Sequence, residues 1–210
     1  MNSVVRQMFV VLMVVGGIAG LVLAGTEKLT KPLIEQHKRE ELRQSIFEVL
    51  PKAKSYEELE TDALRVFKGF NEQHELVGYA FIAEGSGFQG KIRMIVGIEP
   101  DLDPLLGMRV LEQVETPGLG AKIAEETPKQ DFFEQFAGLE PEWGEELQIP
   151  AAKESQTAEP ETFITYVKNA QPDDPNEVQA ITGATISSAA VVQIINRSLD
   201  TLEDLVEQKR

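Results

Sequence analysis

The chain opens with an apolar run that limits how it can fold. Residues 8–25 (MFVVLMVVGGIAGLVLAG) are 18 residues without one polar side chain. A helix of this length spans about 27 Å at the usual rise per residue, close to the hydrocarbon thickness of a bilayer. We therefore predict a single-pass transmembrane helix over residues 8–25, preceded by a short N-terminal tail at residues 1–7.

A cleaved signal peptide is the alternative interpretation of this run. Val22, Leu23 and Ala24 form an acceptable cleavage site, and cleavage after Ala24 would release a secreted domain. The run is longer than the apolar core of a signal peptide, which is about 7–15 residues. We therefore favour an uncleaved anchor and keep the secreted domain as the alternative.

The charges that flank the run leave its orientation open. Arg6 precedes the run, whereas four basic residues follow it: Lys28, Lys31, Lys38 and Arg39. The positive-inside rule would place the large domain in the cytoplasm, but this rule weakens for long translocated domains. Charge alone therefore does not fix the side of the membrane.

The composition excludes several classes of site. A formal net charge of -15 argues against nucleic-acid binding, because a phosphate backbone requires clustered Lys and Arg. The absence of cysteine excludes disulfides, thiolate metal sites and cysteine nucleophiles. The two histidines, His37 and His74, are far apart in the sequence, so we predict no transition-metal site.

Beyond the apolar run, the sequence predicts a linking helix and one α+β domain. Between Leu33 and Leu50 apolar residues recur at helical spacing among charges, and Pro51 ends the pattern. We assign residues 26–51 to an amphipathic linking helix and residues 52–210 to the domain. The strand-like and helical segments of this domain favour a largely antiparallel sheet with flanking helices.

Apolar alternation and turn residues predict the elements of the domain. Strands are expected at residues 63–70, 76–83, 91–98, 109–114 and 162–168. A short helix is expected at residues 131–138, with a core face of Phe132, Phe133 and Phe136. Loops are expected at residues 150–161 and 171–177. A final helix at residues 187–207 carries one apolar stripe: Val191, Ile194, Ile195, Leu199, Leu202 and Leu205.

The segment ITGAT, residues 181–185, comes just before this final helix. A helix N-terminus presents unpaired N–H donors and a partial positive charge, which suit a phosphate. Gly183 and Ala184 leave room for a bulky group, and Thr185 offers it a hydroxyl. Ordinary capping by Thr185 or Ser187 explains the same residues, and for the segment taken alone capping is the simpler interpretation.

Two motifs in a fixed order resemble the FMN-binding domain family. Residues 182–185 match the [ST]-G-A-T of its flavinylation motif, and Ser187 and Ser188 follow after Ile186. ETPGLGAKI at residues 115–123 is similar to its flavin-facing loop, and residues 78–98 resemble its central strands. The family includes the G subunit of the Rnf complex and the C subunit of the sodium-translocating NADH:quinone reductase. The single anchor, the order of motifs and the length fit the G subunit.

This resemblance implies a covalent flavoprotein. FMN would be joined through its phosphate to Thr185 as a phosphoester, made by a flavin transferase. The chain would be the electron-transfer subunit of a membrane-bound, ion-translocating ferredoxin:NAD+ oxidoreductase, relaying single electrons between neighbouring membrane subunits. Its FMN-binding domain would lie on the extracytoplasmic side of the cell (inner) membrane. The expected cofactor residues are Thr185, Thr182, Gly183, Ala184, Ile186, Ser187, Ser188, Glu115, Thr116, Gly118 and Leu119.

Within the flavin-facing loop, Leu119 is expected to lie against the flavin face. Thr116 and Lys122 are candidates for polar contacts, although we interpret Lys122 as a solvated loop charge. Gln179 stands three residues before Thr182, where the family motif has an acidic residue. A glutamine there keeps a hydrogen bond while losing the charge.

Two other functions stay open. The first is that of the C subunit of a sodium-translocating NADH:quinone reductase, which has the same cofactor and a different electron route. The second is a membrane-tethered binding or assembly module in which the GAT segment only caps a helix. Such a module should stay colourless when it is made beside a flavin transferase.

Overall fold

The computed structural model describes residues 3–59, 61, 63–125, 132–143 and 163–207. It comprises two units, residues 1–43 and residues 44–210, which we describe separately. The helices are α1 (Ser3–Val49) and α2 (Thr185–Glu207), with two 3-10 turns, η1 (Gly120–Ala124) and η2 (Glu134–Phe136). The strands are β1 (Ser55–Leu59), β2 (Val66–Phe70), β3 (Leu76–Ser86), β4 (Lys91–Ile98), β5 (Leu105–Gln113), β6 (Thr165–Val167) and β7 (Glu177–Gln179).

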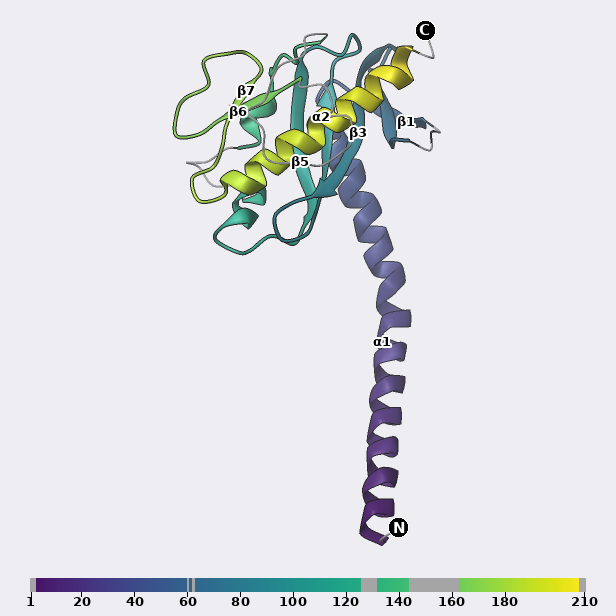
Figure 1. Cartoon of the computed structure of the whole chain (residues 1–210). Helices are drawn as coiled ribbons and strands as arrows, with labels where there is room; N and C mark the ends of the chain where they lie inside the picture. Colours follow the sequence, from purple (N-terminus) through teal and green to yellow (C-terminus); the bar gives the residue numbers. More distant parts are fainter. Residues whose placement is uncertain (1–2, 60, 62, 126–131, 144–162, 208–210) are drawn as a thin grey trace. The chain divides into compact units, whose positions relative to one another are not determined.

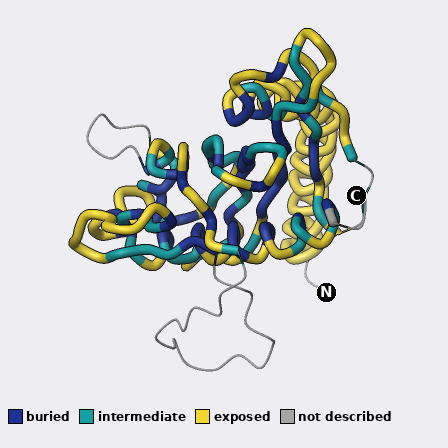
Figure 2. Tube along the Cα trace, turned by 90° about the horizontal axis from the view of Figure 1, so that it is seen from above, coloured by how far each residue is buried: buried dark blue, intermediate teal, exposed yellow. Residues whose placement is uncertain are grey.

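The described part of the first unit is helical throughout and belongs to α1. Its residues from Ser3 to Glu41 are exposed (yellow in Figure 2), and α1 is long and apolar enough to cross a membrane. The helix continues through Pro32 and ends at Val49, two residues before Pro51. It therefore has no break between residues 25 and 26, and our division there into membrane and linking segments stays a prediction.

The second unit is built on a five-stranded antiparallel sheet in the order β1-β2-β3-β4-β5. Each strand pairs with its neighbour in the chain (Figure 1). A separate two-stranded pair, β6 with β7, is parallel. The predicted α+β fold with a largely antiparallel sheet is confirmed.

Helix α2 covers one face of this sheet, and the last residues of α1, which belong to the second unit, lie against the other face. On one face Gly85 of β3 lies against α2, where an added Cβ would come within 2.6 Å of Ile194 Cγ1. On the other face Gly97 of β4 leaves room for the backbone of Val49, the last residue of α1. Strand residues point alternately to the two faces, and both sets are buried where the helices cover them.

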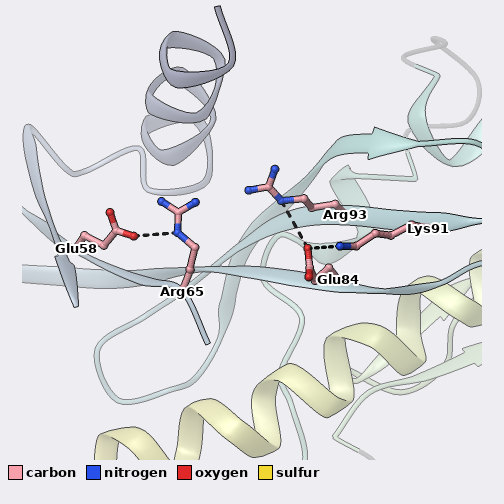
Figure 3. A network of polar contacts seen from close by, with 5 residues as sticks. All are labelled: Glu58, Arg65, Glu84, Lys91 and Arg93. Carbon is pink, nitrogen blue, oxygen red and sulfur yellow. Dashed lines mark hydrogen bonds and ion pairs between the residues drawn. The ribbon is translucent and has the colours of Figure 1, made fainter. Parts of the chain in front are cut away.

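The rest of the face opposite α2 carries solvated charges (Figure 3). Glu84 of β3 forms ion pairs with Lys91 at 2.9 Å and Arg93 at 3.8 Å, both on β4. Nearby, Arg65 pairs with Glu58 of β1 at 2.8 Å. The side chains of these pairs are partly or largely exposed, so we interpret this region as a solvated surface of the sheet. Because solvent screens such pairs, each contributes at most about 1 kcal/mol.

Several predicted boundaries differ from the structure. The strand predicted at 63–70 begins at Val66, the one predicted at 109–114 already begins at Leu105, and the one predicted at 162–168 covers only Thr165–Val167. In the described part of residues 131–138 there is only the 3-10 turn η2, although Phe132 and Phe136 are buried as expected. The predicted loop at 150–161 lies outside the described residues. Strands β1 and β7 were not predicted, because they are short and their apolar residues alternate weakly.

The final helix begins at Thr185, two residues earlier than predicted. Its apolar stripe packs on the sheet as expected: Val191, Ile194, Ile195, Leu199 and Leu202 are buried, and Leu205 is half-buried against them. A buried asparagine, Asn196, lies between these residues and holds the segment just before β6. Asn196 accepts a hydrogen bond from the Ile164 N–H at 3.0 Å and donates to the Ile164 carbonyl at 2.9 Å.

Candidate functional site

A cavity of about 320 Å³ lies where three segments of the second unit meet. These are the turn between β3 and β4, the loop after β5, and the start of α2. The lining residues are Phe88, Glu115, Thr116, Leu119, Gly120, Gly183, Ala184, Thr185, Ile186 and Ser187. The two motifs that stood far apart in the sequence therefore form one site.

The start of α2 presents free donors to this site. The first bond of the helix runs from the Ser188 N–H to the Ala184 carbonyl at 2.8 Å, so the three residues before Ser188 lie in the first turn. Within the described chain, the N–H groups of Thr185, Ile186 and Ser187 have no acceptor. Three unpaired donors and the positive end of the helix dipole suit an anionic group such as a phosphate.

The turn before α2 depends on its small residues. Gly183 has a φ of 82°, in the left-handed region that favours glycine. The next residue, Ala184, is buried, and its N–H donates to the Ile181 carbonyl at 2.9 Å. This turn places Thr185 as the first residue of the helix, half-buried and lining the cavity.

Ser188 has a different role from its neighbours. It is fully buried; its hydroxyl accepts from the Ile181 N–H at 3.1 Å and donates to the Ala184 carbonyl at 3.0 Å. It therefore ties the turn to the helix from the inside, and it is not among the cavity-lining residues. The sequence analysis expected Thr185 or Ser187 to cap the helix, but the side chain that holds the turn to the helix is that of Ser188.

The loop after β5 forms a tight turn that leads into η1. The Thr116 carbonyl accepts from the N–H groups of Leu119 and Ala121, each at 3.1 Å. Gly118, with a φ of 73°, makes the bend between them. This turn leaves Leu119 exposed at the cavity.

Glu115 is the one acidic residue, among those that the structure describes, that lines the cavity. Its side chain is 5% exposed and accepts a hydrogen bond from the Ser187 hydroxyl at 2.6 Å. Burial by itself raises the pKa of Glu115, but hydrogen bonds from Ser187 and from the backbone N–H groups of residues 88–90 outweigh burial and hold the pKa below its ordinary value. The carboxyl group is therefore ionised at neutral pH.

Lys122 lies beside the same turn. It belongs to η1, and its Nζ donates to the Thr182 carbonyl at 3.3 Å. The ammonium group contacts the motif that precedes α2 through a solvent-exposed hydrogen bond, and our interpretation of Lys122 as a solvated loop charge stays a prediction. The sequence could not show this, since 60 residues separate the two positions.

The structure brings together most, but not all, of the expected cofactor residues. Eight line the cavity: Glu115, Thr116, Leu119, Gly183, Ala184, Thr185, Ile186 and Ser187. Thr182, Gly118 and Ser188 shape the surrounding turns without lining it. We missed Phe88 and Gly120; a large apolar residue between Gly87 and Gly90, at a turn, was the available signal for Phe88.

Exposed apolar side chains gather at this site. Among the described residues of the second unit, the exposed large apolar side chains are Phe88, Val114, Leu119 and Ile186. Three of them line the cavity, and Val114 lies against the same hairpin, beside Gly90. A cavity with an apolar rim and a few convergent polar groups is typical of a site for a small molecule or cofactor.

The model of the FMN-binding domain family matches residues 87–200, which include every residue of the cavity. The chain belongs to this family. Residues 87–200 also contain β4, β5 and most of α2, so the match covers both motifs that lead to the prediction, while β3 lies outside it. The predicted family and its cofactor, FMN, are confirmed.

Relatives that match over most of the chain indicate which subunit type within the family it resembles. The chain is 31% identical over 204 residues to the G subunit of the ion-translocating oxidoreductase complex of Methanosarcina acetivorans, with 93% of each chain covered. It is 29% identical to the G subunit of the Na(+)-translocating ferredoxin:NAD(+) oxidoreductase complex of Acetobacterium woodii, over 97% of this chain and 94% of that one. This member of the FMN-binding domain family therefore belongs with the G subunits.

Solved structures support the fold. The C subunit of the Na(+)-translocating NADH-quinone reductase from Parabacteroides distasonis superposes with a TM-score of 0.59 at 21% identity, covering 81% of this chain and 94% of that one. Shewanella oneidensis NqrC superposes with a TM-score of 0.54 at 19% identity, covering 76% and 72%. At these identities the similarity shows a shared fold, and the alternative function in a quinone reductase has no further support.

Proposed function

We propose that this chain is the electron-transfer subunit of an ion-translocating ferredoxin:NAD+ oxidoreductase complex and carries FMN covalently on Thr185. The observation that carries this proposal is the position of Thr185. Its hydroxyl-bearing side chain stands at the first residue of α2, at the cavity, beside three N–H groups without an acceptor in the described chain.

The residues of the site fit each part of FMN. A phosphoester on Thr185 would lie at the positive end of α2, where the N–H groups of its first turn can hold the phosphate oxygens. Lys122 adds a cation beside the preceding turn. The apolar rim offers Phe88, Leu119 and Ile186 to the flavin ring. When bound, FMN supplies the redox chemistry by accepting and passing on electrons.

The chain itself contributes position and environment. Gly183 and Ala184 keep the approach to Thr185 free of side chains, so that a flavin transferase can reach the hydroxyl. Burial of one ring face on apolar side chains would exclude water from the flavin, which changes its reduction potential. A covalent link would prevent loss of the cofactor.

We also propose a location. The candidate membrane span in α1 would anchor the chain in the cell (inner) membrane, with the FMN-binding domain on the extracytoplasmic side. There it would exchange electrons with other membrane subunits of an Rnf-type complex, and the relatives named as G subunits support this assembly.

The decisive experiment is intact mass and in-gel fluorescence of the full chain made together with a flavin transferase. We expect a mass gain of one FMN less one water, with fluorescence that survives denaturation. Thr185→Ala should abolish both signals. Thr201→Ala is the matched control, since it removes a hydroxyl from the same helix at a position that does not line the cavity, and it should keep both signals. An unmodified wild-type chain would refute the covalent proposal and favour the membrane-tethered binding module.

A further inference from the structure

We infer that Glu115 is a positioning residue whose single carboxylate joins the three walls of the cavity and whose charge lowers the midpoint potential of the flavin. The second half of this inference rests on the proposed function. The first half concerns the protein without its cofactor.

The carboxylate bridges segments that are distant in the sequence. Oε2 accepts from the hydroxyl of Ser187, 72 residues away on the first turn of α2, at 2.6 Å. Oε1 accepts from the N–H of Gln89, in the turn between β3 and β4, at 3.0 Å. The N–H of Glu115 itself donates to Gln113 Oε1 at 2.6 Å, which fixes the residue at the end of β5. One side chain therefore holds the hairpin turn, the loop after β5 and α2 together.

Two glycines allow the carboxylate to enter this space. A Cβ added at Gly87 would collide with Glu115 Oε1, and one added at Gly120 would collide with Oε2. Any other residue at either position would push the carboxylate away from its donors. Because both oxygens are already engaged by the protein, we assign Glu115 to positioning the cavity walls rather than to contact with FMN.

The charge of Glu115 has a second consequence. A buried carboxylate interacts with neighbouring charges more strongly than an exposed one, because less solvent screens it. Glu115 lines the cavity and is ionised at neutral pH, as its hydrogen bonds require. A fixed negative charge there opposes the addition of electrons to a group in the cavity, so it should lower the midpoint potential of the flavin.

Three substitutions separate position from charge. Glu115→Gln keeps the size and one carbonyl oxygen for the backbone N–H groups, and Ser187 can turn its hydroxyl to accept from the amide, so the bridge survives without the charge. Glu115→Ala removes the bridge and the charge together. Glu125→Gln is the matched control, because it removes the same charge from an exposed residue that does not line the cavity.

The first measurement is amide hydrogen exchange on the full chain, made without flavin transferase. In Glu115→Ala the amides of residues 88–90 should exchange about tenfold faster than in the wild type, the effect of losing one buried hydrogen-bonding group. Glu115→Gln and Glu125→Gln should exchange like the wild type. Equal exchange in Glu115→Ala and the wild type would overturn the positioning role, whether or not FMN binds.

The second measurement is the midpoint potential of the flavinylated full chain, after intact mass has established the loading of each variant. Glu115→Gln should have a more positive potential than the wild type, while Glu125→Gln should leave it unchanged. An unchanged potential in loaded Glu115→Gln would overturn the electrostatic role. A wild-type chain that takes up no FMN would refute the proposed function and the electrostatic role together, and hydrogen exchange would still decide the positioning role.

Discussion

The Lys122 ammonium group donates to the carbonyl of Thr182 at 3.3 Å, which joins η1 to the turn before α2. The same Nζ would lie 3.5 Å from a Cβ added at Gly183, so the cation sits directly against this turn. The positive end of α2 and the positive charge of Lys122 therefore lie beside one another. Their combination makes this part of the cavity suited to a phosphate.

Removal of this cation should slow FMN attachment. In Lys122→Met the side chain keeps much of its length but loses the charge, so the phosphate loses an electrostatic partner. We expect the rate of mass gain with a flavin transferase to fall about two- to tenfold, corresponding to about 0.4–1.4 kcal/mol. Lys54→Met removes a cation from an exposed residue that does not line the cavity and should react like the wild type. Equal rates for both variants would exclude a role for Lys122.

Phe88 should shield the flavin without stabilising the fold. Its side chain is 64% exposed, so Phe88→Ser should change the free energy of unfolding by no more than about 0.5 kcal/mol. If the ring packs on the flavin, the substitution should increase quenching of the flavin fluorescence by iodide. Val114→Ser is the control, because Val114 is equally exposed on the rim but does not line the cavity. Identical quenching in the two variants would place the flavin away from Phe88.

Asn196 should matter for stability and not for the flavin. It is 3% exposed and pairs with both the N–H and the carbonyl of Ile164. Asn196→Ala leaves these two backbone groups without their partner, so we expect a loss of about 1–3 kcal/mol in urea unfolding. Gln193→Ala, an exposed position on the same helix, should cost less than about 0.5 kcal/mol. A loss of FMN attachment in folded Asn196→Ala would contradict this separation.

Glu115 should make the protein less stable in acid. Its pKa is lower in the folded protein than in the unfolded chain, so its ionised form stabilises the fold at pH values above the unfolded pKa. This stabilisation should be lost as the pH falls below about 4.3, the ordinary value for glutamate, towards the lower folded pKa. Unfolding measured from pH 7 to pH 3 should therefore show a steeper loss for the wild type than for Glu115→Gln. Parallel curves would show that Glu115 does not titrate with folding.

Asp103 should change the stability with pH in the direction opposite to Glu115. Burial, and then the nearby carboxylates of Glu140 and Asp101, raise the pKa of Asp103 in the folded protein. Its protonation therefore favours the fold, so Asp103 offsets a part of the acid destabilisation that Glu115 causes. The comparison of wild type with Glu115→Gln cancels this contribution, because both chains contain Asp103.

The sequence by itself determined the features that depend on local pattern. The apolar run at residues 8–25 predicts a membrane span because its length matches the hydrocarbon thickness of a bilayer and it has no polar side chain. The stripe from Val191 to Leu205 predicts a helix with one buried face, and β4 agrees with its predicted bounds, 91–98. Two motifs in order were specific enough to predict the family, since a resemblance needs only the residues themselves.

Only the tertiary structure decided how these residues act. It places Ser188 inside the turn and Ser187 against Glu115, although the two serines are neighbours in the sequence. It also brings Phe88 to the cavity and Lys122 to Thr182. Local periodicity specifies which face of an element is apolar, but not which distant segment a polar group will meet. Those partners follow from the packing of the sheet against α2, where a buried carboxylate must find donors or lose its charge.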